Sequence, residues 1–167
     1  MTDLRNHIRD VPDFPSPGIL FRDIAPLLRD HFVATIDALS ALLTAEEWRS
    51  LDAVAGIESR GFILAAALAD RYGKGFVPIR KKGKLPPPVV DRAYALEYGS
   101  GVLEMQRGSG RLLIVDDVLA TGGTLRAAAD LCVDAGYDVS RLIVLIDLRL
   151  LPDFRWREQT TAAVIQY

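Results

Sequence analysis

Short apolar runs alternate with helical patterns along most of this chain, and that alternation limits the possible folds more than any other feature. Runs typical of strands cover 51–57, 75–79, 112–115, 141–148 and 162–166. Patterns typical of helices, each followed by a glycine, cover 61–72 and 124–135. Several of the strands are apolar along nearly their whole length, as strands covered on both faces are. The alternation therefore predicts an α/β fold with a central, mainly parallel sheet flanked by helices.

The first 43 residues follow a different pattern. Residues 2–11 favour a short helix with Thr2 as its N-cap, and the apolar spacing over 30–43 predicts a second helix with one packed face. Between them, Pro15, Pro17 and Pro26 exclude a long helix. We therefore expect an extended segment there, followed by a helix that packs on the rest of the protein.

Length and charge set wider limits. A chain of 167 residues predicts a single domain over 1–167. The net charge of -2, from 20 Lys plus Arg and 22 Asp plus Glu, predicts no general attraction to nucleic acid or to a membrane surface. Any anion site must therefore be local.

The single cysteine, Cys132, has no partner for an internal disulfide, which fits a reducing compartment. The longest purely apolar run, 62–69, is too short to span a bilayer, and the charged first ten residues lack a secretory signal. We therefore expect a cytoplasmic protein.

Three motifs follow predicted strands. They are GIESRGF at 56–62, PIRKKGK at 78–84 and VDDVLATGGT at 115–124. In open parallel sheets, ligands bind at the carboxyl ends of the strands, so we expect these motifs to lie close together.

The segment 120–124, ATGGT, has the features of an anion site, and we call it the phosphate cup. Gly122 and Gly123 allow their backbone amides to converge on an anion. The predicted helix adds the positive end of its dipole, and Thr121 and Thr124 add hydroxyl donors. The nucleotide-triphosphate loop is excluded because Thr124 stands where that motif needs lysine.

Two carboxylates, Asp116 and Asp117, precede the cup. They would repel a bare phosphate, but they can accept hydrogen bonds from vicinal hydroxyls or bind a metal that the phosphate also touches. Taken alone, the acid pair is also compatible with solvated carboxylates at a strand end, and the cup alone is compatible with an ordinary capped helix start. Together they favour a ligand that carries both a phosphate and a polyol, such as a sugar phosphate.

At this point a family resemblance becomes clear. VDDVLATGGT resembles the signature of type I phosphoribosyltransferases, and four further stretches are similar to the adenine-specific members: DFPSPGILFRDIAPLL (13–28), ESRGF (58–62), PIRKKGKLP (78–86) and ALEYG (95–99). The similarity runs from about residue 8 to the end. It implies the family's fold with an N-terminal hood at about 10–28 and a flexible lid at about 82–104, and it implies a homodimer.

The resemblance also implies a reaction, the transfer of a 5-phosphoribosyl group from phosphoribosyl diphosphate to adenine, giving AMP and diphosphate. The 5-phosphate would be bound by Ala120, Thr121, Gly122, Gly123 and Thr124, and the ribose hydroxyls by Asp116 and Asp117. The diphosphate would be bound by Glu58, Ser59, Arg60, Gly61, Arg80, Lys81 and Lys84. Mg²⁺ would arrive with the diphosphate, with no metal held directly by the protein.

At the base end, the resemblance implies that adenine stacks on Phe21, with backbone groups of Leu20 and Arg22 at its edge and Leu148 lining the pocket. In the lid, Glu97 would contact the purine ring nitrogen as an acid or an orienting group, and Tyr98 would accompany closure. Glu97, Asp116 and Asp117 are thus the candidate catalytic residues.

Two alternatives remain open. One is a transferase for a 6-oxopurine, which family members recognise with a lysine that follows the signature. All four lysines here, at 74, 81, 82 and 84, precede it, although Arg149 could substitute. The other is a regulator that senses phosphoribosyl diphosphate and binds DNA. Taken alone, the basic run 80–84 is also compatible with solvated surface or a weak nucleic-acid patch. Such regulators carry an added DNA-binding domain, and only about ten residues precede the family match here.

Overall fold

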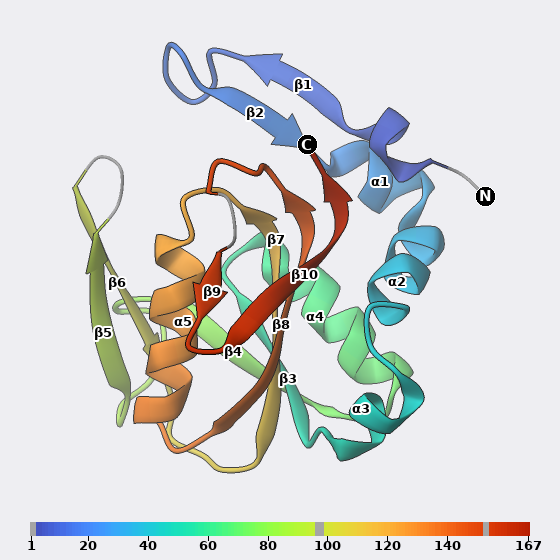
Figure 1. The fold of residues 1–167 in the computed structure, drawn as a ribbon. Helices are drawn as coiled ribbons and strands as arrows, with labels where there is room; N and C mark the ends of the chain where they lie inside the picture. The colour runs from blue at the N-terminus through green and yellow to red at the C-terminus, as the bar shows by residue number, and fades with distance from the viewer. Residues whose placement is uncertain (1–2, 96–98, 152–153) are drawn as a thin grey trace.

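The computed structural model describes residues 3–95, 99–151 and 154–167, and a sheet of eight strands organises them (Figure 1). The strand order is β5-β6-β4-β3-β7-β8-β10-β9. The central strands are parallel to one another: β4 (Gly75–Lys81), β3 (Ala53–Ile57), β7 (Arg111–Leu119), β8 (Asp138–Asp147) and β10 (Gln159–Gln166). Antiparallel strands form the two edges: β6 (Ser100–Met105) and β5 (Val90–Ala95) at one, and β9 (Arg155–Trp156) at the other. The predicted mainly parallel sheet is confirmed.

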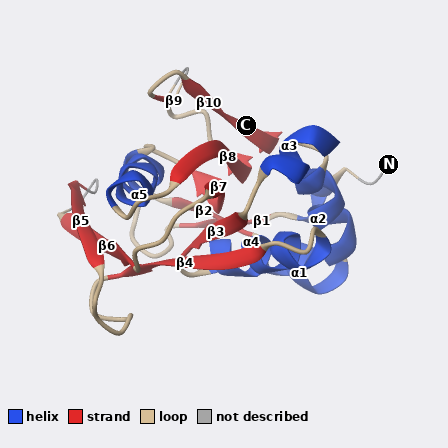
Figure 2. Cartoon of the chain, turned by 90° about the horizontal axis from the view of Figure 1, so that it is seen from below, coloured by secondary structure: helices blue, strands red, loops and turns tan. Residues whose placement is uncertain are grey.

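Helices cover both faces of this sheet (Figures 1 and 2). On one face lies α5 (Gly123–Asp134), and on the other lie α4 (Arg60–Arg71) and α2 (Phe32–Ser40). Along β7, Leu112 and Ile114 join the core beneath α5, whereas Leu113 and Val115 join the core beneath α4. Because successive residues of a strand point to opposite faces, a strand covered on both sides needs an unbroken apolar run.

Strand β7 is longer than the sequence predicts. It continues past Val115 to Leu119 because Asp116, Val118 and Leu119 pair in register with β8. Asp116 and Asp117 therefore lie within the strand and not after it.

The N-terminal segment forms a separate two-stranded hairpin beside the end of β10 (Figure 1), in the region where a hood was predicted. Its strands are β1 (Arg9–Pro12) and β2 (Leu20–Asp23). The predicted helix over 2–11 is wrong: only Leu4–His7 forms a 3-10 turn, η1. Strand pairing outweighs the local helical pattern because ion pairs join Arg9 to Asp23 and Arg22 to Asp10 across the hairpin. Thr2 lies outside the described residues.

Two short helices complete the fold, α1 (Ala25–Asp30) and α3 (Ala45–Ser50). The latter begins with a capping box in which Thr44 and Glu47 satisfy each other's backbone amides. Among the helices of the three described ranges, none is long and apolar enough to cross a membrane.

Candidate active site

The ends of β3, β4 and β7 that carry the sequence motifs meet at one edge of the sheet, around a cleft of about 380 Å³. Each of the three sequence motifs contributes to it. The lining residues are Ile57, Glu58, Ser59, Arg60, Lys81, Tyr94, Leu103, Asp116, Asp117 and Thr124. The structure thus brings predicted 5-phosphate, ribose and diphosphate residues together in one cleft.

The phosphate cup joins β7 to α5. Gly122 is the N-cap of α5 and has a φ of +77°, a left-handed conformation that favours glycine. A Cβ at this position would lie 2.4 Å from ring atoms of Phe154, so space also requires glycine. As a glycine, this N-cap has no side chain that could accept from the first turn of α5, whose leading amides lack partners within the helix. These amides are suited to binding an anion.

The acid pair lies beside the cup, and both residues are only 8% exposed. Burial, followed by the negative charge of Asp117, raises the pKa of Asp116 well above its ordinary value. Arg60 compensates part of this charge, because its Nε lies 2.7 Å from Oδ2 of Asp117. The Asp117 amide donates to Oδ1 of Asp116 over 2.9 Å.

Arg60 connects this acid pair to two other parts of the site. It is the first residue of α4, directly after the Glu58–Ser59 peptide bond, which is cis. Its guanidinium carbon also lies 4.8 Å from the centre of the Phe21 ring in the N-terminal hairpin. A Cβ on Gly61 would lie 3.0 Å from Oδ1 of Asp116, so glycine lets α4 approach β7 closely.

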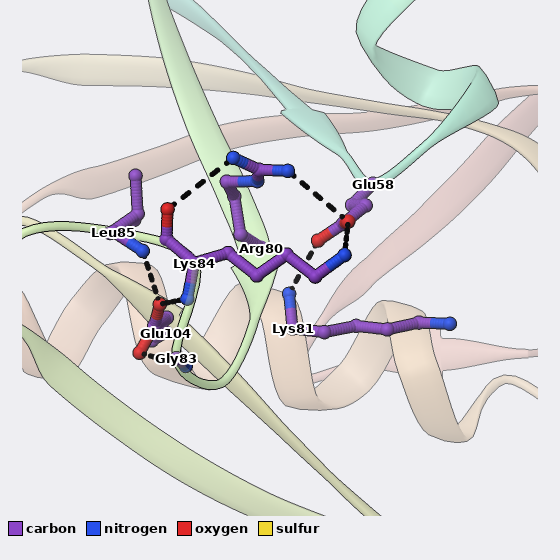
Figure 3. Close-up of polar contacts among 7 residues, drawn as sticks. All are labelled: Glu58, Arg80, Lys81, Gly83, Lys84, Leu85 and Glu104. Carbon is purple, nitrogen blue, oxygen red and sulfur yellow. Dashed lines mark hydrogen bonds and ion pairs between the residues drawn. The ribbon is translucent and has the colours of Figure 1, made fainter.

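Three predicted diphosphate residues lie in the segment 80–85, which we call the basic turn: Arg80, Lys81 and Lys84. All three contact Glu58 (Figure 3). The Lys81 amide donates to Oε2 of Glu58 over 2.7 Å, while Nη2 of Arg80 and Nζ of Lys84 lie 3.4 and 3.3 Å from Oε1. Burial opposes ionisation of Glu58, but these hydrogen bonds outweigh it and lower its pKa below 4.5.

The Glu58 side chain is a feature that sequence reasoning missed. Glu58 was predicted only as a residue that binds the diphosphate, yet its carboxylate is the common partner of the basic turn. Tyr94 and Leu103, from β5 and β6, also line the cleft without having been predicted. The sequence did contain one signal of a buried acid near the site, which is Glu104 inside the apolar run VLEM at 102–105. Charged residues are seldom buried without partners.

The predicted adenine residues do not line this cleft. Leu20, Phe21 and Arg22 lie on β2, where Leu20 is exposed and the Phe21 ring meets that of Phe14 edge-on at 5.1 Å. Leu148 follows β8, half-buried, and its amide donates to the carbonyl of Leu119. The contact between Arg60 and Phe21 connects the hairpin to the cleft. Glu97 and Tyr98 lie outside the described residues.

Comparison with known proteins assigns this arrangement to a family. A sequence model of the phosphoribosyl transferase domain matches residues 28–151, so the chain belongs to the phosphoribosyltransferases. Within them it belongs to the adenine phosphoribosyltransferases. It is 53% identical to the protein of that name from Hydrogenovibrio crunogenus, over 98% of this chain and 96% of the relative. It is also 53% identical to the one from Bdellovibrio bacteriovorus, over 99% of both chains.

Solved structures agree with this assignment. The adenine phosphoribosyltransferase of Rhodothermus marinus superposes with a TM-score of 0.85 at 42% identity, over 98% of this chain and 96% of the other. The Saccharomyces cerevisiae enzyme, solved with adenine bound, superposes with a TM-score of 0.87 at 34% identity, over 97% and 96% of the two chains. The predicted fold class and family are confirmed.

Proposed function

We propose that the cleft transfers the 5-phosphoribosyl group of phosphoribosyl diphosphate to adenine, so that the protein salvages the purine as AMP and releases diphosphate. The observation that carries this proposal is the buried acid pair, which lines one cleft together with Thr124 of the phosphate cup and Lys81 of the basic turn. A ligand that carries a phosphate, vicinal hydroxyls and a diphosphate matches these three parts. The relatives at 53% identity support adenine as the acceptor.

At the sugar end, the cup amides and the hydroxyls of Thr121 and Thr124 would bind the 5-phosphate. Asp116 and Asp117 would accept hydrogen bonds from the ribose hydroxyls. Because Arg60 already holds Asp117, the carboxylates are oriented before the sugar arrives. Such preorganisation is what allows a site to position a reactive sugar without further rearrangement.

At the leaving-group end, Arg80, Lys81 and Lys84 would bind the diphosphate together with the 58–61 backbone. Within the described ranges, no three metal-ligating side chains come together. Mg²⁺ would arrive with the diphosphate, because it typically keeps several waters and binds the phosphates of its substrate. Bound Mg²⁺ would neutralise part of the charge that develops on the departing diphosphate.

The chemistry needs no covalent nucleophile. When the bond from C1 of the ribose to the diphosphate breaks, the electron-poor sugar is captured by a ring nitrogen of adenine. Cys132 fits a structural role, because burial raises the pKa of its thiol to about 12. The protein would act by positioning the reactants, stabilising the leaving group's charge and excluding water.

The N-terminal hairpin, as a hood, would bring Leu20, Phe21 and Arg22 to the base, and Leu148, after β8, would line the pocket. The segment 82–104, as a lid, would bring Glu97 and Tyr98. The contact of the Arg60 guanidinium over the Phe21 ring supports the hood, since it already joins the hairpin to the cleft. We propose that residues 1–167 act as one domain in the cytoplasm, as a homodimer. Exposed apolar side chains such as Ile63 and Phe76 support an interface, which sedimentation would test.

A turnover assay tests the proposed reaction. The purified protein, Mg²⁺ and phosphoribosyl diphosphate are mixed with adenine, hypoxanthine, guanine or xanthine in separate reactions, and nucleotides are separated chromatographically. We expect AMP from adenine alone. Product from an oxopurine alone would overturn the choice of base, and no product from any base would overturn the transferase.

A further inference from the structure

Glu104 is a buried carboxylate to which the proposed reaction assigns no part. It lies in β6 between the buried apolar residues Leu103 and Met105 and is 3% exposed. Its neighbours in the sheet are Arg80 in β4 and Asp91 in β5. Burying an acid is costly unless it is well hydrogen-bonded, so its partners indicate its role.

Within the described residues, all hydrogen bonds that the Glu104 carboxylate accepts come from backbone amides of the basic turn (Figure 3). The Gly83 amide donates to Oε2 over 3.0 Å, and the amides of Lys84 and Leu85 each donate to Oε1 over 2.7 Å. Hydrogen bonds from the Gly83 amide, and then from those of Leu85 and Lys84, lower the pKa of Glu104 despite its burial. An ionised carboxylate that accepts from three successive amides fixes the path of that turn.

The path of the turn decides where two cations lie. Nζ of Lys84 lies 3.3 Å from Glu58, and the carbonyl of Lys84 accepts a hydrogen bond from Nη1 of Arg80 over 3.4 Å. Two acids, Glu58 directly after β3 and Glu104 within β6, therefore hold the basic turn. Glu104 binds the backbone of residues 83–85. Glu58 binds the backbone amide of Lys81 and the side chains of Arg80 and Lys84 (Figure 3).

We propose that Glu104 is a positioning residue for the leaving group, which holds residues 83–85 so that Lys84 and Arg80 face the diphosphate before it binds. The proposal rests on the function proposed above. A lysine side chain is flexible, so the position of its backbone limits where its charge can act. Cations fixed in advance stabilise a departing anion without reorganising at the moment of reaction.

The variant Glu104→Gln tests this role through two ligands that occupy opposite ends of the site. Glutamine keeps the size of the side chain but offers one carbonyl oxygen and turns an NH₂ group toward amide donors. In calorimetric titrations with Mg²⁺, we expect inorganic diphosphate to bind about tenfold more weakly, as the loss of charge-assisted hydrogen bonds implies. Because AMP does not occupy the diphosphate end, we expect its affinity to change by less than about twofold.

We expect the steady-state KM values for the two substrates to show the same selectivity. We expect the KM for phosphoribosyl diphosphate to rise about tenfold, with the KM for adenine nearly unchanged, because only the diphosphate end of the site is altered. A general loss of structure would instead affect both substrates.

Two further variants accompany this test. Asp91→Asn is the matched control: it removes the same charge from the paired strand, but Asp91 is exposed, and among the described residues its carboxylate pairs with Nζ of Lys82, at 2.9 Å, rather than with an amide of the basic turn. We expect it to leave both affinities unchanged. Glu104→Asp keeps the charge and draws it back by one methylene, so a smaller selective loss of about threefold is expected, and this variant supplies the test if Glu104→Gln does not fold.

Equal weakening of diphosphate and AMP in the two Glu104 variants would overturn the positioning role, and so would unchanged diphosphate affinity in both. Failure of the wild-type protein to form AMP would count against the proposed function alone, because the diphosphate titration does not depend on turnover.

Discussion

The phosphate cup and the basic turn are both proposed anion sites, but they are built in opposite ways. Residues 120–124 of the cup are continuous in sequence, directly between a buried strand and a buried helix. The basic turn at 80–85 is held by Glu58 and Glu104, each about twenty residues away along the chain. One site is thus a local motif, and the other is assembled by tertiary contacts.

This difference suits what each end would have to do. A cup set by glycine conformation and a helix N-terminus cannot move far, which suits the phosphate that stays on the sugar throughout. A turn held by hydrogen bonds to side chains can exchange partners, which suits a diphosphate that must arrive and leave. We therefore expect substitutions at the cup to weaken the binding of both substrate and product. Substitutions at the basic turn should weaken the binding of diphosphate alone.

The largest effect is expected for Asp117→Asn, beside the cup. The change removes the charge that would accept hydrogen bonds from the ribose and that pairs with Arg60. Two hydrogen bonds to a charged group, at about 1.5–3 kcal/mol each, imply a fall in kcat/KM of at least about a hundredfold. Asp138→Asn, at the exposed start of β8, is the control. Unchanged kinetics in Asp117→Asn would remove this residue from the site.

A smaller effect is expected for Gly122→Ala. Alanine would be strained by the left-handed backbone at this position, and its Cβ would clash with the ring of Phe154. We expect the variant to be less stable by about 2 kcal/mol and, because the cup is distorted, to turn over more slowly. Gly73→Ala is the matched control, because Gly73 also has a positive φ, of +59°, but has no atom within 4 Å of the added Cβ and lies far from the cleft. Urea unfolding and turnover would be compared. If the two variants lost turnover equally, the cup would not depend on Gly122.

At the basic turn, Lys84→Met should weaken diphosphate binding by about tenfold, roughly 1.4 kcal/mol, and leave AMP binding intact. Lys82→Met is the control, because Lys82 is exposed and pairs with Asp91 away from Glu58. Titrations with both ligands would measure the contrast. If Lys84→Met lost affinity for AMP as much as for diphosphate, the cup and the basic turn would not act as separate anion sites.

The smallest effect concerns stability and pH. Because burial, and then the charge of Asp117, raises the pKa of Asp116, the folded protein binds that proton more tightly than the unfolded chain does. The contribution of Asp116 to stability is therefore greatest below its ordinary pKa of 3.8 and is lost as the pH rises toward the folded value. Asp116→Asn should thus stabilise the unliganded protein at neutral pH by about 1 kcal/mol, or about 2–4 °C in Tm, while lowering activity. Thermal unfolding from pH 4 to 7 would measure the rise in Tm of the variant. A rise that did not depend on pH would contradict its origin in the raised pKa of Asp116.

The sequence was informative wherever a signal was local. Alternating apolar runs predicted the parallel sheet because a strand covered on both faces needs apolar residues on both faces. The cup was predicted because its glycines, threonines and acids are adjacent. The same local reasoning was wrong for 2–11, where pairing between β1 and β2 outweighs a short helical pattern. It also ended β7 too early, since pairing with β8 carries the strand through both aspartates.

By itself, then, the sequence determined the layered α/β fold, the family and the cup, because periodicity and adjacent motifs survive in a linear chain. Only the tertiary structure decided which side chains hold these motifs in place. Glu58 and Glu104 acquire their partners through the order β6-β4-β3, which brings strands distant in sequence side by side. Periodicity does not encode that order, because strand order depends on how whole layers pack and not on the residues next to each glutamate.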